Sequence, residues 1–230
     1  MKELFITSSY AGVTISLIAY MIGVGLKNKF KTGLFNPLLV SIVITIAVLV
    51  VFNIDYEVYN ESAKILSWLL TPATVCLAVP LYEQLEILKK NFKAIILGIF
   101  SGVLTSMFTV FVLSKMMGLS HKEYVTLLPK SITTAIGMGV SEELGGFVTI
   151  TVAVIIITGV IGNIIATGVC KVFKITDSVA KGLAIGTSAH AIGTAKAMEM
   201  GEIEGAMSSL SIAVAGIITV LSANAFSGLI

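Results

Sequence analysis

Polar side chains that could bind a small anion gather in two short stretches of an otherwise apolar chain. The first is PKSITT, residues 129–134, and the second is GTSAHAIGTAK, residues 186–196. Such donors suit an anion near the amino end of a helix, where free N–H groups and the positive end of the dipole lie. For each hydroxyl the alternative is ordinary packing between helices. The predicted ligand-binding residues are Ser131, Thr133, Thr134, Thr187, Ser188, His190 and Thr194.

His190 is the candidate for proton coupling in this site. An ionisable group at membrane depth is costly and is therefore a functional candidate by default. The ordinary histidine pKa of about 6.5 allows a change of charge within the physiological range. Glu143 is the second candidate. The alternatives are a buried histidine that bonds a backbone carbonyl, and a glutamate that is solvated at a helix end.

The elements that must position these residues are membrane helices. Of 230 residues, 56% are hydrophobic and only 12% are charged, and the mean hydropathy is +1.00. One soluble core could not hide so much apolar surface. About 20 helical residues cross a hydrocarbon layer, where every backbone group must be paired. Clear spans are expected at about 4–26, 34–52, 94–114, 147–171 and 206–228, with shorter, interrupted apolar stretches at 65–81, 125–141 and 179–197.

The lysines predict how the chain is oriented. They follow the first span, whereas acidic residues fill the next loop, so the positive-inside rule places the N-terminus outside. The lysines after the span at 147–171 also lie inside only if the segment 125–146 enters the membrane and returns to the outer face. By the same count, the segment 182–204 enters and returns from the cytoplasm.

The two entering segments also resemble each other. AIGMGVSEELG at 135–145 aligns with AIGTAKAMEMG at 191–201, and an apolar span follows each copy. This pattern predicts inverted repeat units at 124–172 and 179–229 within one domain, 1–230. The alternative is coincidence in a biased composition. The expected fold is an all-α integral membrane protein, a polytopic helical bundle with inverted repeats and two interrupted or re-entrant helices.

Several other functions find no support in the sequence. The net charge of +2 and the short basic tracts give no footprint for nucleic acid. Cys76 and Cys170 stand alone without metal-ligand spacing, so we expect neither a metal nor a cofactor. The spans lack HExxH, GxSxG and paired aspartates, so an intramembrane enzyme is not expected. GIFSG at 98–102 is a small-xxx-small pattern, which predicts a homo-oligomer.

Two long passages resemble the LrgB/CidB family of bacterial membrane proteins. They are PKSITTAIGMGVSEELGG at 129–146 and KGLAIGTSAHAIGTAKAMEMGEIEGAMSSLSIAVAGIIT at 181–219. The resemblance implies a multi-pass protein of the bacterial cell (inner) membrane, with a separate LrgA/CidA-type membrane partner. Family members are described as holin- or antiholin-like modulators of murein hydrolase activity and autolysis, and also as pyruvate transport components. A plant relative is the plastid glycolate/glycerate translocator.

Two functions remain after these observations. The favoured one is a carrier of small monocarboxylates such as pyruvate, glycolate, glycerate or lactate, working by proton-coupled alternating access. The polar groups cluster in two short segments, whereas a wide pore needs helices with one continuous polar face. The alternative is a holin- or antiholin-like modulator of murein hydrolase activity and autolysis.

Overall fold

The computed structural model describes residues 10–30, 35–76 and 78–230. Throughout these residues the regular structure is helical and contains no strand, which confirms the all-α prediction. The chain divides into two compact units, Met1–Cys76 and Leu77–Ile230, which are described separately. Residues 4–9 of the predicted first span lie outside the described residues.

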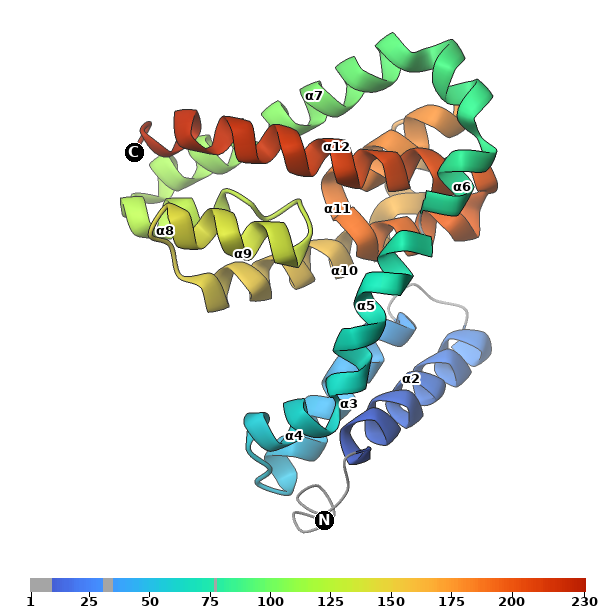
Figure 1. Cartoon of the computed structure of the whole chain (residues 1–230), viewed down its shortest axis with the longest axis vertical. Coiled ribbons are helices and arrows are strands. Elements are labelled where there is room, and N and C mark those ends of the chain that lie inside the picture. Colours follow the sequence, from blue (N-terminus) through green and yellow to red (C-terminus); the bar gives the residue numbers. More distant parts are fainter. Residues whose placement is uncertain (1–9, 31–34, 77) are drawn as a thin grey trace. The chain divides into compact units, whose positions relative to one another are not determined.

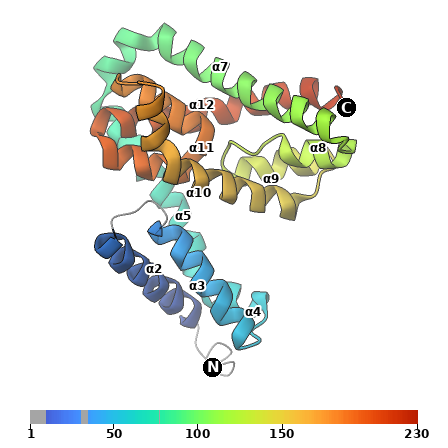
Figure 2. The ribbon, with the colours of Figure 1, turned by 180° about the vertical axis from the view of Figure 1, so that it is seen from behind.

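The first unit is built around a helical hairpin. Helices α2 (Ala11–Phe30) and α3 (Pro37–Val51) lie side by side (Figures 1 and 2). Their close approach requires a glycine, because a Cβ on Gly23 would lie 2.8 Å from the backbone of Pro37. The Asn36 side chain caps α3 by accepting the backbone N–H groups of its first turn. Two further helices, α4 (Tyr56–Ser62) and α5 (Lys64–Cys76), complete this unit.

The second unit contains the longest helices of the protein. Its helices are α6 (Ala78–Glu83), α7 (Leu85–Met117), α8 (His121–Leu127), α9 (Thr134–Glu143), α10 (Val148–Val172), α11 (Ser178–Met200) and α12 (Glu202–Ser227). In length and composition, α2, α7, α10 and α12 are each able to cross a membrane. The predicted span at 34–52 corresponds to α3, which has only 15 residues.

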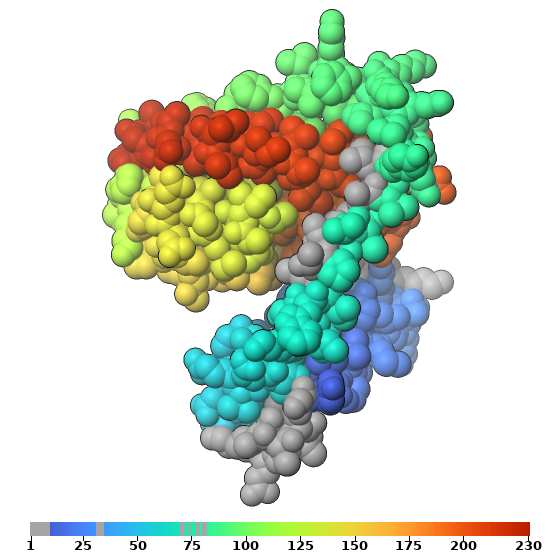
Figure 3. Space-filling model, in the orientation of Figure 1, coloured from blue at the N-terminus to red at the C-terminus, as the bar shows by residue number. Residues whose placement is uncertain are grey.

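The core of the second unit lies between α7, α8 and α12. One face of α7 is buried at a helical spacing through Ile95, Ile99, Val103 and Met107. This face packs against α8 and α12, and the three elements also lie together in the space-filling view (Figure 3). Large apolar side chains elsewhere on the long helices are exposed, as expected of surfaces that face lipid.

Helix α11 is broken at His190 and turns back on itself. His190 has φ 41° and ψ −141°, which is not helical. Beyond the break, a Cβ on Gly193 would lie 3.1 Å from the Ile185 side chain, and Ala197 packs in one cluster with Ile185. In a straight helix residues 185 and 197 would be about 18 Å apart. The segment therefore forms a helical hairpin with its tip at His190.

The segment from α8 to α9 forms a second hairpin. The Thr126 hydroxyl, near the end of α8, accepts the backbone N–H of Phe147, which follows α9, at 2.8 Å. The Thr151 hydroxyl lies 2.8 Å from the Thr126 carbonyl oxygen and 2.7 Å from the Ser141 hydroxyl. These bonds hold the entering and returning arms together at the start of α10. The tip of this hairpin is the non-helical stretch 128–133.

The two hairpins approach from opposite ends of α12. The Tyr124 hydroxyl in α8 donates to the Phe226 carbonyl at 2.8 Å, near the C-terminal end of α12. Lys181 of α11 pairs with Glu204, in the first turn of α12, at 3.8 Å. Residues 204 and 226 of one helix are about 33 Å apart. The prediction of two interrupted or re-entrant helices is confirmed, whereas the inverted sequence repeat stays a prediction.

The start of α8 carries a capping box. The Ser120 hydroxyl accepts the Glu123 N–H at 3.4 Å, and the Glu123 carboxylate accepts the Ser120 N–H at 2.8 Å. Hydrogen bonds from the Ser120 hydroxyl and then from its backbone lower the pKa of Glu123. The ionised Glu123 therefore stabilises the folded protein at pH values above the pKa that this group has in the unfolded chain. This stabilisation is lost as the pH falls through the lower pKa of the folded state.

We predict that hydrogen-exchange protection at the start of α8 weakens below about pH 4. Glu123→Gln keeps a hydrogen-bonding side chain but does not titrate, so its protection factors should depend less on pH. The measurement is exchange by mass spectrometry with intrinsic rates corrected for pH. An identical pH dependence in both proteins would contradict this role of Glu123.

Candidate site where the two hairpins meet

The tips of the two hairpins meet beside the middle of α7. A Cβ on Gly102 would lie 3.0 Å from the Thr187 hydroxyl, at the tip of α11. One turn further along α7, the Ser106 and Ser131 hydroxyls are hydrogen-bonded at 3.1 Å, and Ser131 belongs to the other tip. One cavity between the tips, lined by Ser131 and Thr187, has a volume of only about 10 Å³. That space barely accepts one water molecule.

Lys130 brings a cation to this crossing. Its ammonium donates to the Ser131 hydroxyl at 2.8 Å and to the Ser106 hydroxyl at 3.2 Å. The side chain is half-buried, and within the part of the chain that the structure describes no carboxylate pairs with it. The ammonium thus depends on hydroxyl oxygens, which compensate a buried charge less well than an anion does.

His190 lies at the other tip and is almost completely buried. Its Nε2 lies 3.0 Å from the carbonyl oxygen of Ile155 in α10. The ring packs on Gly159, where a Cβ would come within 2.7 Å of it. A buried histidine that bonds a backbone carbonyl is the alternative to proton coupling that the sequence left open for His190. The ring joins the break in α11 to the middle of α10.

Two further side chains secure the same break. The Thr194 hydroxyl lies 3.0 Å from the His190 carbonyl oxygen, and it shares a 2.7 Å hydrogen bond with Ser208 of α12. Asn163 of α10 donates its amide to the Ile192 carbonyl at 2.7 Å. The interruption leaves backbone groups without helical partners, and in a membrane these groups must be satisfied from nearby side chains. The polar groups at this tip are therefore occupied by bonds within the protein.

The other predicted site residues lie around these tips. Thr187 is buried and bonds the Leu183 carbonyl at 2.7 Å, and the exposed Ser188 bonds the Ala184 carbonyl at the same distance. Thr133 is the N-cap of α9 without a side-chain cap bond, and Thr134 is the first residue of that helix. Glu143 is exposed at the end of α9, and none of the described contacts joins it to His190. Binding by these residues stays a prediction.

Sequence reasoning missed Ser106, Asn163 and Ser208 at the crossing. Each is a polar residue within a long apolar span, and a polar side chain there must find an internal partner. That signal marks them as buried in the bundle, but it does not say which tip they contact. In the described residues no cluster of three or more His, Cys, Asp or Glu side chains could hold a metal ion.

The Lys130 cluster leads to a prediction about stability. Ser131→Ala removes the nearer of the two acceptors of the half-buried ammonium and leaves it only Ser106, so it should destabilise the protein by about 1 kcal/mol. Lys130→Met removes the charge at similar volume and should cost less. The measurement is unfolding in mixed micelles for both single variants and the double variant. If Ser131→Ala lowers the free energy of unfolding equally in the wild-type and the Lys130→Met protein, the bond between Lys130 and Ser131 does not stabilise the fold.

Comparison with known proteins shows that the sequence is similar to bacterial proteins of one family. The LrgB-like family matches residues 16–229. The antiholin-like protein LrgB of Bacillus cereus strain B4264 is 41% identical over 213 residues, which cover 92% of this chain and 93% of the relative. The protein of the same name from Bacillus anthracis strain CDC 684 / NRRL 3495 has the same identity and coverage. No solved structure matches the chain.

These relatives overturn the leading functional prediction. Both are named antiholin-like, so the prediction of a proton-coupled monocarboxylate carrier is wrong, and the antiholin-like alternative agrees better with them. The geometry gives a physical reason. Four of the hydroxyls that suggested an anion site, those of Ser131, Thr187, Ser188 and Thr194, bond other hydroxyls or backbone carbonyls, and the cavity beside Ser131 and Thr187 measures only about 10 Å³. In this protein the clustered polar residues stabilise the interrupted helices by bonding to the backbone and to one another.

Proposed function

The chain belongs to the LrgB-like family, and we propose that it is an antiholin-like membrane protein that restrains murein hydrolase activity and autolysis. The observation that carries this proposal is the 41% identity to antiholin-like relatives over 92% of the chain. The match includes both hairpins and all the helices of the second unit. In this proposal the protein catalyses no reaction. It acts by changing the permeability of the membrane.

The closed crossing of the hairpins supports an antagonist of a pore over a pore itself. A pore needs a continuous polar path through the bilayer. At the level where the tips meet, apolar side chains and paired hydroxyls leave about 10 Å³. A protein with this geometry blocks solutes at its midpoint. It can then lower membrane permeability by occupying or competing for a pore-forming partner.

The proposed location is the bacterial inner membrane, which the chain crosses several times. If α12 crosses the bilayer, the arms of the α8–α9 hairpin end at one face and those of α11 end at the other, because the hairpins contact opposite ends of α12. A separate LrgA/CidA-type partner and a homo-oligomer remain proposals. The GIFSG motif no longer supports the homo-oligomer, because Gly98 and Gly102 pack against α11 of the same chain.

The proposed function is tested in cells. We expect that expression in a Bacillus cereus strain without its own LrgB-like protein slows detergent-induced lysis several-fold and reduces murein hydrolase bands in zymograms. A variant that cannot pack α11, described in the Discussion, serves as the negative control. If the wild-type protein is present in the membrane at normal levels and lysis is unchanged, the antiholin-like function is wrong.

Pore and antagonist are distinguished with purified protein. In lipid vesicles loaded with a small fluorescent dye, the protein should release dye no faster than empty vesicles do. Rapid release would assign a holin-like pore instead.

A further inference from the structure

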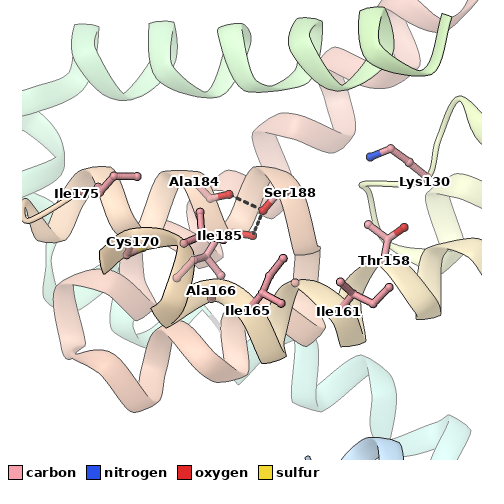
Figure 4. A pocket seen from close by; sticks show the side chains of 12 residues that line it. Lys130, Thr158, Ile161, Ile165, Ala166, Cys170, Ile175, Ala184, Ile185 and Ser188 are labelled. Atoms are coloured by element: carbon pink, nitrogen blue, oxygen red, sulfur yellow. Dashed lines mark hydrogen bonds between the residues drawn. The ribbon is translucent and has the colours of Figure 1, made fainter. Parts of the chain in front are cut away.

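A long apolar groove lies between α10 and α11 and reaches the crossing at its inner end, where Lys130 lines it. Its volume is about 420 Å³, within the range of small-molecule sites. Figure 4 shows aliphatic side chains of α10 along it, with Ala184, Ile185 and Ser188 of α11 opposite. The apolar residues on the side of α10 and just after it are Ile161, Ile165, Ala166, Val169, Cys170 and Ile175. Ile161 and Ile165 are about half exposed, so the groove is open at the surface of this unit.

The two ends of the groove differ in polarity. At the inner end Lys130 and Thr158 line it, and the ammonium is already bonded to Ser106 and Ser131. The outer end, at Cys170 and Ile175, coincides with the end of α10. The groove therefore runs from the end of a membrane-spanning helix toward its middle.

The outer end carries positive charge. Lys171 lies in the last turn of α10 and Lys174 directly precedes Ile175, and both lysines are exposed. Among the described ion pairs, none involves Lys171 or Lys174. Because Lys171 follows Cys170 and Lys174 precedes Ile175 in the chain, positive charge lies next to this end of the groove.

We propose that this groove binds one acyl chain of an anionic phospholipid, whose headgroup lies beside Lys171 and Lys174. Lipid chains run inward from the membrane surface, as the groove does, and basic residues at the cytoplasmic end of a span attract anionic headgroups. The ammonium of Lys130 ends the apolar part and limits how far the chain reaches.

The proposal is independent of the antiholin-like function and is tested by photo-cross-linking. Purified protein is placed in nanodiscs that contain phosphatidylglycerol or phosphatidylcholine with a photoreactive group near the end of one acyl chain. Labelled positions are then mapped by mass spectrometry. We expect phosphatidylglycerol to label residues 161–170 several-fold more than phosphatidylcholine does. Equal labelling by the two lipids, or even labelling of exposed positions on other helices such as Leu97 of α7 and Ile217 of α12, would overturn the proposal.

Variants separate the headgroup contact from the chain contact. Lys171→Gln with Lys174→Gln should reduce labelling by phosphatidylglycerol to the level of phosphatidylcholine. Lys89→Gln with Lys90→Gln removes the same charge from exposed lysines of α7 and should change nothing. Ile165→Trp fills the groove and should reduce labelling at 161–170 several-fold while leaving the labelling of Ile217 on α12 unaffected. Retention of wild-type labelling by either the Lys171/Lys174 double variant or Ile165→Trp also overturns the proposal.

Discussion

Replacement of Gly186 by leucine is expected to prevent α11 from packing on α12. A Cβ at this position would lie 2.5 Å from the Ser208 carbonyl oxygen and 2.6 Å from the Ser211 Cβ. Both contacts are with parts of α12 that cannot rotate away. Overpacking of this kind costs about 1–3 kcal/mol, and more where the backbone must move. We therefore expect the variant to fail to fold, or to unfold at a much lower temperature than the wild-type protein.

The matched control is Gly168→Ala in α10. A Cβ at Gly168 has no neighbour within 4 Å, so the substitution introduces no clash. Alanine is favoured over glycine within a helix by about 1 kcal/mol, so this variant should be as stable as the wild-type protein or slightly more stable. Thermal unfolding in detergent and membrane expression level measure both variants. Equal stability of the Gly186 and Gly168 variants would contradict the close packing of α11 on α12.

His190 gives the second large expected effect, because it combines an unfavourable backbone with a favourable side chain. Its φ of 41° lies in a region that glycine adopts easily and other residues adopt at a cost of about 1–3 kcal/mol. Its ring bonds the Ile155 carbonyl and packs on Gly159. His190→Ala keeps the backbone cost and loses these contacts, so it should strongly destabilise the hairpin. His190→Gly loses the same contacts but relieves the backbone.

The test is which of the two variants, His190→Ala or His190→Gly, is more stable. Glycine in an ordinary helix is less stable than alanine by about 1 kcal/mol, so an unbroken α11 predicts that the alanine variant is the more stable one. The turn at His190 predicts the reverse. Unfolding with increasing amounts of a denaturing detergent compares them directly. A more stable His190→Ala variant would show that α11 continues through residue 190.

Composition and hydropathy predict the all-helical membrane fold because a bilayer imposes a simple rule on long apolar segments. The limits of the helices are harder to predict. Hydropathy places one span at 94–114, whereas α7 extends over Leu85–Met117. Its first two turns contain Lys89 and Lys90, which leave the apolar pattern although the helix continues through them. Backbone hydrogen bonds can continue a helix beyond the residue at which its apolar surface ends.

The site could be predicted only in part. Lysine distribution correctly indicates that both polar segments are interrupted, whereas the repeat suggested by the AIG pattern stays a prediction. The position of the break in α11 does not follow from the sequence, because residue 190 is neither glycine nor proline and its conformation is held by Ile155, Gly159 and Thr194. The hydroxyls were also ambiguous, since the same residue types bind anions or satisfy a broken backbone. Long-range contacts decide between these roles.

The two-hairpin arrangement is the central structural claim, and one labelling measurement tests it most directly. Glu143 and Glu199 are exposed near the ends of the returning arms of the two hairpins. Each is replaced by cysteine in a protein whose Cys76 and Cys170 are serine, and a membrane-impermeant thiol reagent is added to one side of sealed vesicles. Hairpins that enter from opposite ends of α12 predict that the two positions react from opposite sides of the membrane. Reaction of both positions from the same side would contradict the arrangement and the closed crossing that depends on it.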